Sequence, residues 1–347
     1  MTRRRIGRLQ RAVRRLRSRL RQQVLILLYH RVAKLDQDPW SLAVTPHRFA
    51  EHLEVMRQRA RPIPLQQLAR ALSYGNLPNR SVVVTFDDGY ADNLHDAKPL
   101  LERHDVPATV FVSSGFIGHW GEMWWDELDH LLLQPGMLPE KLQLNVNRNT
   151  YQWKLGEVAQ YSERTQRRHR RWRAWEEAPS SRHALYCSLW ELLHTATEEE
   201  RRKVLSELRD WADAEPAKRL THRLLSLKEV VGLAQGGLVE IGAHTVTHPV
   251  LSVLSLTSQR REILESKNRL QAILGRPVTS FAYPYGRHSD YSAKTLTIVQ
   301  QAGFTTSCCN FSGLVKRGTD PFQLPRVQVH DWDGDEFDRE LSQWLGI

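Results

Sequence analysis

Short apolar runs rich in β-branched residues alternate along this chain with segments whose apolar residues are spaced three or four apart. The first pattern is typical of buried strands and the second of amphipathic helices. Strands that alternate with helices predict an α/β fold built on a mainly parallel sheet. The predicted strands are residues 24–32, 63–65, 82–86, 108–113, 238–243, 278–283 and 304–308. The predicted helices are residues 46–57, 65–72, 93–104, 227–234, 257–274, 291–303 and 336–345.

The regular alternation is interrupted once, over residues 120–225. We predict a helical, Arg- and Trp-rich insertion there, with one helix at residues 198–212. It separates two parts of one α/β domain, residues 24–119 and 226–347.

Arginine and tryptophan are interleaved within the insertion, over residues 167–175. Such a run can grip phosphates and stack on flat groups. We interpret it either as part of a solvated helical lid or as a pad for a lipid-linked phosphate or acidic glycan. A nucleic-acid contact is the less favoured interpretation, because no nucleic-acid fold signature accompanies the run.

Two adjacent acids end the apolar run at residues 82–86. Asp87 and Asp88 are followed by Gly89, which can turn the chain at a sheet edge. Because adjacent side chains of an extended strand point to opposite sides, we expect different roles for the two carboxylates, one binding a cation and the other handling a proton. A turn acid followed by a helix cap would have the same local sequence.

A second apolar run leads into a pair of histidines, His244 and His248. Histidines four apart lie on one face of a helical turn, so both imidazoles can reach one metal ion while a carboxylate supplies a third ligand. Zinc in such a site lowers the pKa of water to about 7 and polarises a carbonyl group, as hydrolysis of an amide or ester requires. For this segment alone, a packed or capping histidine pair is the alternative.

Three segments of the chain together match a set of motifs. They are Thr85-Phe86-Asp87-Asp88-Gly89-Tyr90, His244-Thr245-Val246-Thr247-His248 and Tyr283-Pro284-Tyr285-Gly286. With them the chain resembles the polysaccharide deacetylases, carbohydrate esterase family 4, over most of residues 24–341 apart from the insertion. The resemblance implies a distorted (β/α) barrel with fewer strands than the usual eight.

The resemblance also implies roles for individual residues. Asp88, His244 and His248 would hold a divalent metal ion, with Zn²⁺ as the expected one. Asp87 would be the general base, and the backbone N–H of Tyr90 would help to hold the oxyanion.

A histidine near the start of the domain completes the implied site. The family has a Leu-x-His motif whose histidine is the general acid, and Leu28-Tyr29-His30 resembles the form in which a circular permutation places this motif first. We therefore expect His30 to protonate the leaving amine, which suits a pKa near neutrality. A histidine that only hydrogen-bonds at a strand end is the alternative. His330 is the rival acid, with Asp331 as its orienting partner.

The third motif departs from the family pattern, because Phe281 stands where an arginine usually steadies the base carboxylate. We hypothesise that Arg287 or Arg326 replaces that arginine. Core packing is the usual role of paired aromatic residues, but their rings can also carry a sugar. The candidates for substrate binding are Tyr283, Pro284, Tyr285, Trp124, Trp125 and Arg326.

Basic residues are concentrated at the N-terminus. The 347-residue chain has 49 Lys and Arg against 39 Asp and Glu, a formal charge of +10. Residues 1–22 hold ten arginines and no acid, so the remainder is formally neutral. Apolar residues recur at helical spacing within residues 1–23, which predicts a basic amphipathic arm suited to an anionic membrane. A solvated tail is the alternative.

Other sequence features bear on the location of the protein. No stretch has the eighteen or so apolar residues of a spanning helix, and no small-residue cleavage site of a secretory signal follows the basic arm. Cys187, Cys308 and Cys309 give no disulfide framework, which fits a reducing compartment. We expect a cytoplasmic protein, either free or in peripheral contact with the inner face of the membrane.

These observations predict a metal-dependent hydrolase that removes an N-acetyl group from an amino sugar of a polysaccharide or glycolipid precursor. Hydrolysis of O-acetyl esters or small amides on the same site is one alternative. A glycan-binding protein without turnover is another. The intact acid and histidine set argues against this last alternative, and the absent motif arginine argues weakly for it.

Overall fold

The computed structural model describes residues 22–119, 121–146 and 149–346. Most of the predicted basic arm lies outside the described residues, so its membrane contact stays a prediction. Among the described helices, none combines the length and apolar character needed to cross a membrane.

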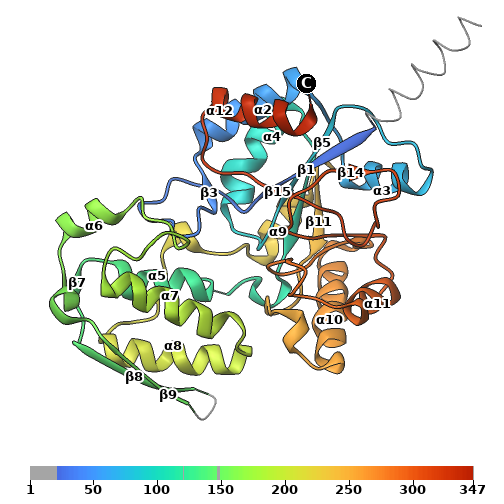
Figure 1. Ribbon diagram of the computed structural model, residues 1–347. Coiled ribbons are helices and arrows are strands. Elements are labelled where there is room, and N and C mark those ends of the chain that lie inside the picture. Colours follow the sequence, from blue (N-terminus) through green and yellow to red (C-terminus); the bar gives the residue numbers. More distant parts are fainter. Residues whose placement is uncertain (1–21, 120, 147–148, 347) are drawn as a thin grey trace, which may run out of the picture.

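One sheet of nine strands forms the centre of the molecule (Figure 1). Its order is β13-β12-β11-β6-β5-β1-β14, with β15 beside β1 and β4 beside β5. Neighbouring strands are parallel except for β1 and β14. The sheet curls into a half-barrel surrounded by helices, which confirms the predicted α/β, distorted-barrel fold. The strands are β1 (Gln23–Tyr29), β4 (Arg61–Pro62), β5 (Ser81–Phe86), β6 (Ala108–Val112), β11 (Val239–Ala243), β12 (Ser280–Ala282), β13 (Thr306–Cys308), β14 (Val315–Lys316) and β15 (Val327–Gln328).

The two central strands explain the longest apolar runs. β1 and β5 pair in register over six residues, from Val24 with Ser81 to Tyr29 with Phe86. Their paired residues are buried on both faces of the sheet, so the sequence of each strand is an almost unbroken apolar run instead of an alternation.

Helices cover the curled sheet and share its main hydrophobic core. α2 packs against α12, and α10 packs against α9 and α11. A short parallel pair, β2 (Arg31–Val32) with β3 (Ala43–Val44), follows β1. A π-helical turn at Asn93–Ala97 precedes α4. The helices are α2 (Pro46–Arg59), α3 (Leu65–Ser73), α4 (Lys98–His104), α9 (Leu227–Ala234), α10 (Leu256–Leu274), α11 (Ala293–Gln301) and α12 (Gly334–Leu345).

Several element boundaries differ from the prediction by one or more residues, and two of these differences bear on how an element begins. The predicted strand at residues 63–65 lies too late in the chain. The observed strand β4 ends at Pro62, and Leu65 is already the first residue of α3. α10 begins earlier than predicted because Ser255 is its cap: the Ser255 hydroxyl accepts a hydrogen bond from the Ser258 N–H at 3.2 Å.

The insertion has a hydrophobic cluster of its own. The insertion contains helices, as predicted, but β8 and β9 also form an antiparallel hairpin that was not predicted. Exposed and buried residues alternate along β8, which is the pattern of a strand with one packed face. The elements are α5 (Trp124–Leu133), β7 (Gly136–Met137), β8 (Lys141–Val146), β9 (Asn149–Lys154), β10 (Gln160–Tyr161), α6 (Glu163–His169), α7 (Ser181–His194) and α8 (Glu198–Ala212). Short 3₁₀ turns lie at Ser114–Phe116, Gly156–Ala159, Leu220–His222 and Leu251–Val253.

Candidate metal centre and active site

The two motif strands deliver their polar residues to one edge of the sheet. Asp87 and Asp88 follow β5, His244 follows β11, and only β6 lies between these strands. Parallel strands present their C-terminal ends at the same edge, where a pocket of about 380 Å³ opens. Asp88 has a φ of +73°, so the chain turns there and both carboxylates line the pocket.

Asp88, His244 and His248 form a cluster of potential metal ligands. One ligand atom from each residue lies within 4.8 Å of the others. Asp88 Oδ1 is 3.3 Å from His248 Nε2 and 3.6 Å from His244 Nε2. All three side chains are buried, and the cluster borders the pocket on one side.

The protonation of this cluster suits metal binding. Burial lowers the pKa of His244 to about 4 and that of His248 to about 3, so both rings are neutral at pH 7. His244 Nδ1 lies 2.8 Å from the Ala282 carbonyl oxygen, to which it must donate a proton, so Nε2 keeps its lone pair. Burial raises the pKa of Asp88 because it disfavours the charged carboxylate, and a bound cation would offset this effect. This donor set fits Zn²⁺.

The histidines lie on an irregular loop and not on a helical turn, contrary to the prediction. Thr245 and His248 have φ values of +64° and +53°. The Thr245 hydroxyl accepts from the His248 N–H at 3.1 Å. Glu262 of α10 accepts from the N–H groups of Val246 and Thr247 at 2.8 and 2.9 Å. The loop so fixed holds the two imidazole centroids 4.8 Å apart.

Asp87 is held by a buried, bidentate ion pair with Arg326. The two Nη atoms of Arg326 lie 2.7 and 2.6 Å from the carboxylate oxygens. Burial alone would raise the pKa of Asp87, but Arg326 and His244 together lower it to about 2. Arg326 therefore has the position that we hypothesised for a replacement of the absent motif arginine.

This pairing corrects two expectations. The Arg326 side chain is fully buried and its Nε donates to the Cys309 carbonyl at 2.8 Å, so its assignment to substrate binding is wrong. Arg287 does not replace the motif arginine, because its exposed side chain lines the pocket and forms no ion pair with Asp87 among the described residues.

Both candidate acids, His30 and His330, line the pocket. Burial lowers the pKa of His30, while Asp88 and Asp87 partly offset this, so His30 lies within the field of the two carboxylates. His330 Nδ1 instead lies 3.1 Å from the Ser41 hydroxyl. Burial lowers the pKa of both histidines below the near-neutral value expected of the acid, so the choice of His30 stays a prediction.

Asp331 does not orient His330, contrary to the prediction. Its Oδ1 accepts hydrogen bonds from the N–H and the hydroxyl of Thr45 at 2.8 and 2.9 Å. Asp331 thereby holds the start of α2, and the described hydrogen bond of the His330 ring is with Ser41 instead.

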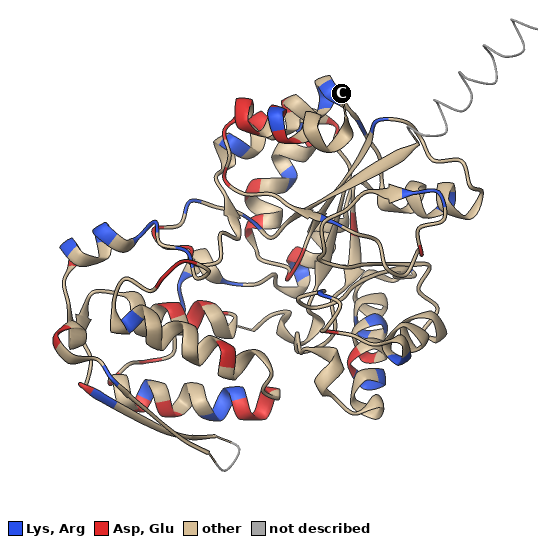
Figure 2. Cartoon of the chain, in the orientation of Figure 1, with Lys and Arg blue, Asp and Glu red and all other residues tan. Residues whose placement is uncertain are grey.

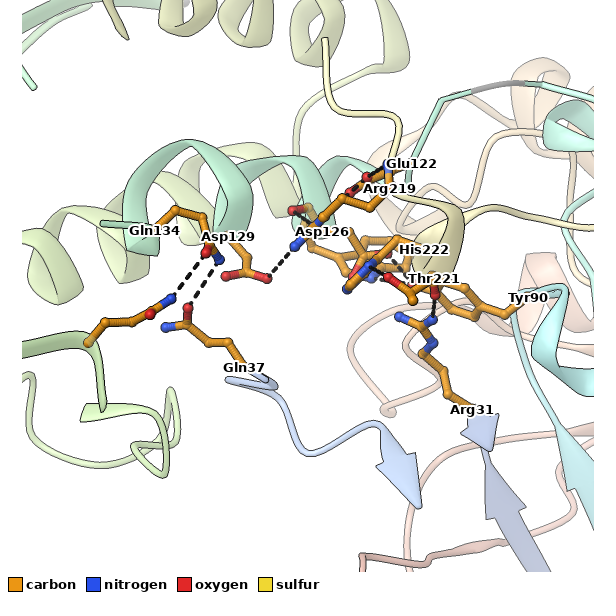
Figure 3. Close-up of polar contacts among 12 residues, drawn as sticks. Arg31, Gln37, Tyr90, Glu122, Asp126, Asp129, Gln134, Arg219, Thr221 and His222 are labelled. Atoms are coloured by element: carbon orange, nitrogen blue, oxygen red, sulfur yellow. Dashed lines mark hydrogen bonds and ion pairs between the residues drawn. The ribbon is translucent and has the colours of Figure 1, made fainter. Parts of the chain in front are cut away.

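Tyr90 joins the site to the insertion (Figure 3). Its hydroxyl donates to Asp126 at 2.7 Å and accepts from Trp125 Nε1 at 2.9 Å, while the Arg31 guanidinium lies 4.2 Å above its ring. Tyr90 and Leu224 form an isolated antiparallel β-bridge. Its hydrogen bonds are made by backbone groups of the residues next to them, so the Tyr90 N–H takes no part in the bridge. That N–H remains a candidate oxyanion donor.

A buried polar network continues from this junction into the insertion (Figure 3). Arg219 pairs with Glu122 at 2.6 Å and donates to the Asp126 carbonyl at 2.7 Å. Burial raises the pKa of Asp126 and of Asp129 to about 7. This network was not predicted, because its only sequence signal is the acids on the apolar helix α5.

Two of the aromatic candidates, Trp125 and Tyr285, line the pocket. Their ring centroids lie 5.0 and 4.7 Å from that of His248. Tyr285 has a φ of +59°, which belongs to the turn that ends the third motif.

The other three aromatic and proline candidates do not line it, and their assignment to substrate binding is wrong. Trp124 is buried, and the Arg201 guanidinium lies 5.3 Å from the centroid of the Trp124 ring. Tyr283 is a core residue that stacks on Tyr291 at 4.3 Å, with its hydroxyl beside that of Ser307. Pro284 is buried next to it.

An arginine of the insertion supports the histidine loop. Arg201 of α8 is buried, and its Nη1 donates to the backbone carbonyl of His248 at 3.3 Å. Its other nitrogens donate to the carbonyls of Leu193 and His194 at the end of α7. This role of Arg201 was not predicted. Its signal is a charge on the same helix face as Val204, Leu205 and Leu208.

Comparisons with known proteins agree with this geometry. The family model described as polysaccharide deacetylase matches residues 74–137 and 210–307, which include the two motifs with the acids and the histidines. A poly-β-1,6-N-acetyl-D-glucosamine N-deacetylase of Staphylococcus epidermidis is 27% identical over 111 residues, covering 28% of this chain and 38% of that protein. The matches span only 33 to 38% of the length of such curated relatives.

Solved structures share the fold over nearly the whole chain. IcaB from Ammonifex degensii aligns with a TM-score of 0.57 and 18% identity, covering 94% of this chain and 98% of that one. The Streptococcus pyogenes deacetylase PplD in complex with acetate aligns with a TM-score of 0.56 and 20% identity, covering 93% and 98%. At these identities the likeness concerns the fold.

Proposed function

We propose that this chain, which matches the polysaccharide deacetylase family model, removes the N-acetyl group from an amino sugar of a polysaccharide or glycolipid precursor. The observation that carries the proposal is the convergence of Asp88, His244 and His248 beside the ionised Asp87 in one pocket. Three ligands with an open side, next to a carboxylate, are what hydrolysis of an amide by activated water requires.

The metal ligands would be Asp88, His244 and His248, with Zn²⁺ the ion that suits this donor set best. Bound Zn²⁺ would supply Lewis acidity, polarising the acetyl carbonyl and making a water molecule more acidic. Asp87, ionised and oriented by Arg326, accepts a proton from the attacking water.

Two further groups of the chain act on the substrate. The Tyr90 N–H donates to the carbonyl oxygen as negative charge develops there. His30 donates a proton to the amine nitrogen while the C–N bond breaks. The water oxygen is then part of acetate, and the sugar carries a free amine.

The choice of an amide on a sugar is supported by the names of related proteins. The Staphylococcus epidermidis relative is named as an N-deacetylase of poly-β-1,6-N-acetyl-D-glucosamine. An acetylated amino sugar in a glycan is therefore the first substrate class to test.

The test is acetate release from N-acetylglucosamine oligomers by zinc-loaded protein. We expect acetate from the wild type and a loss of about 10²–10⁴ in kcat for Asp87→Asn, the usual cost of losing a general base. His244→Ala should lose both zinc and activity. His47→Ala, which changes an exposed histidine of α2, is the matched control and should keep the wild-type rate.

Other outcomes would change the assignment. Acetate from O-acetylated glycans alone would make the protein an esterase. No acetate from any acetylated substrate would refute hydrolysis and leave a glycan-binding protein.

A further inference from the structure

One tryptophan of the insertion stands exposed at the rim of the pocket. Trp175 is 59% exposed and lines the pocket, with its ring centroid 6.2 Å from that of His330. Trp172, three residues earlier in the same basic aromatic run, is by contrast buried against His183 at 4.6 Å. The core therefore accounts for Trp172 and leaves Trp175 without a packing role.

The loop that carries Trp175 is fixed to the main domain. The Ala174 N–H donates to the Pro39 carbonyl at 2.8 Å, and Arg173 Nη1 donates to the Asp38 carbonyl at 3.0 Å. The flanking residues on both sides of the loop are joined by a hydrogen bond from Trp172 Nε1 to the Glu177 carbonyl at 3.1 Å. These bonds hold the exposed indole at the pocket in advance of any ligand.

The pocket lining includes both aromatic and polar residues. Trp40 and Trp190, whose centroids are 4.3 Å apart, line it together with Trp175. The polar lining residues beyond the metal centre include Arg287, Asn310 and Gln328, whose hydrogen bonds to the described residues are made by the backbone. Their side chains are thus available to a ligand.

We propose that Trp175, with Trp40 and Trp190, forms a stacking platform for a sugar ring next to the one that carries the acetyl group. A pyranose ring has an apolar face of C–H groups and a rim of hydroxyls, so it matches a pocket lined both by aromatic rings and by uncommitted amide and guanidinium groups. The substrate is then a neutral glycan of at least two sugars. This inference rests on the proposed function.

The charge of the lining decides against a phosphate-rich or acidic ligand. Beyond the proposed catalytic centre, Arg287 is the one Lys or Arg among the described residues that line the pocket. The arginines of the basic run lie on and after α6, which Figure 2 shows at an edge of the insertion, and none of residues 167–171 lines the pocket. A phosphate pad formed by the basic run would need those arginines in the pocket lining, and they do not lie there.

The test compares the dependence of activity on glycan length. Wild-type kcat/KM should rise from the monosaccharide to the pentasaccharide of N-acetylglucosamine, in β-1,4 or β-1,6 linkage. Trp175→Ala should lose roughly threefold to tenfold on the pentasaccharide, the usual value of one aromatic stack, mainly through KM. Trp175→Phe should recover part of the loss. Trp153→Ala, on the β8–β9 hairpin of the same insertion, is the matched control and should keep the wild-type length dependence.

Calorimetric binding of the pentasaccharide separates this inference from the proposed function. If the wild type binds it without releasing acetate and Trp175→Ala binds it more weakly, the platform stands and the hydrolase fails. If acetate is released with the same length dependence by the wild type and Trp175→Ala, the hydrolase stands and the platform is refuted. A wild type that neither binds nor hydrolyses the pentasaccharide overturns both.

Discussion

The ion pair between Arg326 and Asp87 sets the charge of the proposed general base. It joins two buried side chains that lie 239 positions apart in the chain. A buried carboxylate without a partner would tend to take up a proton, because low dielectric disfavours its charged form. The pair therefore keeps Asp87 both ionised and oriented towards the pocket.

Removing one partner of this pair should be costly. We expect Arg326→Met to lower the free energy of unfolding by about 3–5 kcal/mol, because it leaves a buried charge uncompensated. Adding Asp87→Asn to that variant should restore much of the loss. Urea denaturation of the wild type, both single variants and the double variant measures the coupling. Equal losses in Arg326→Met and in the double variant would show that the charge on Asp87 is not what matters.

The convergence of Asp87, Asp88, His244 and His248 could be predicted, because motif spacing and the shared C-terminal edge of parallel strands identify these residues. The sequence offered Arg287 and Arg326 as partners of Asp87 but could not decide between them, since the pairing arises from tertiary structure. Phe281 in the place of an arginine was the one hint. Aromatic residues beside a motif have the same sequence pattern whether they face the core or the pocket, which explains the wrong assignment of Tyr283 and Trp124.

At the scale of elements, those with a strong local signal were predicted best. α8 occupies the predicted residues because Thr197 and Glu200 form a capping box at its start. The central strands were recognised by unbroken apolar runs. The β8–β9 hairpin was missed because its alternation is short and polar residues dominate it. The irregular histidine loop depends on left-handed backbone at non-glycine residues, which sequence patterns do not reveal.

Helix α8 connects the insertion to the proposed metal centre through Arg201, so this residue should affect metal affinity. We expect Arg201→Met to weaken zinc binding by about 10- to 100-fold, the usual effect of losing support for a ligand. Arg201→Lys should be intermediate. Competition with a chromogenic chelator measures the affinity without any substrate.

The neighbouring residue provides the control for this experiment. Arg202 is exposed and pairs with Glu198 on the surface of the same helix. Arg202→Met should therefore bind zinc like the wild type. Equal weakening in both variants would mean that α8 acts through general stability and not through the His248 carbonyl.

At the scale of the whole molecule, the insertion and the half-barrel meet around the pocket. Tyr90, which follows the two acids, belongs to the hydrophobic cluster of the insertion, and Trp125 of the insertion packs on His248. The buried polar network around Arg219 and Asp126 lies at the same junction. Order at the metal centre and order in the insertion should therefore be coupled.

Zinc binding should accordingly protect both parts of the molecule from unfolding. Zinc at a thousandfold excess over its dissociation constant would stabilise the folded state by about 4 kcal/mol. In hydrogen exchange, we expect added zinc to slow exchange in β5 and the histidine loop, and also in α8 and the end of α7, because Arg201 joins these helices to His248. The β8–β9 hairpin should respond least. If exchange slows in the sheet but not in α7 or α8, the insertion is independent of the metal centre, and Arg201 has only a structural role.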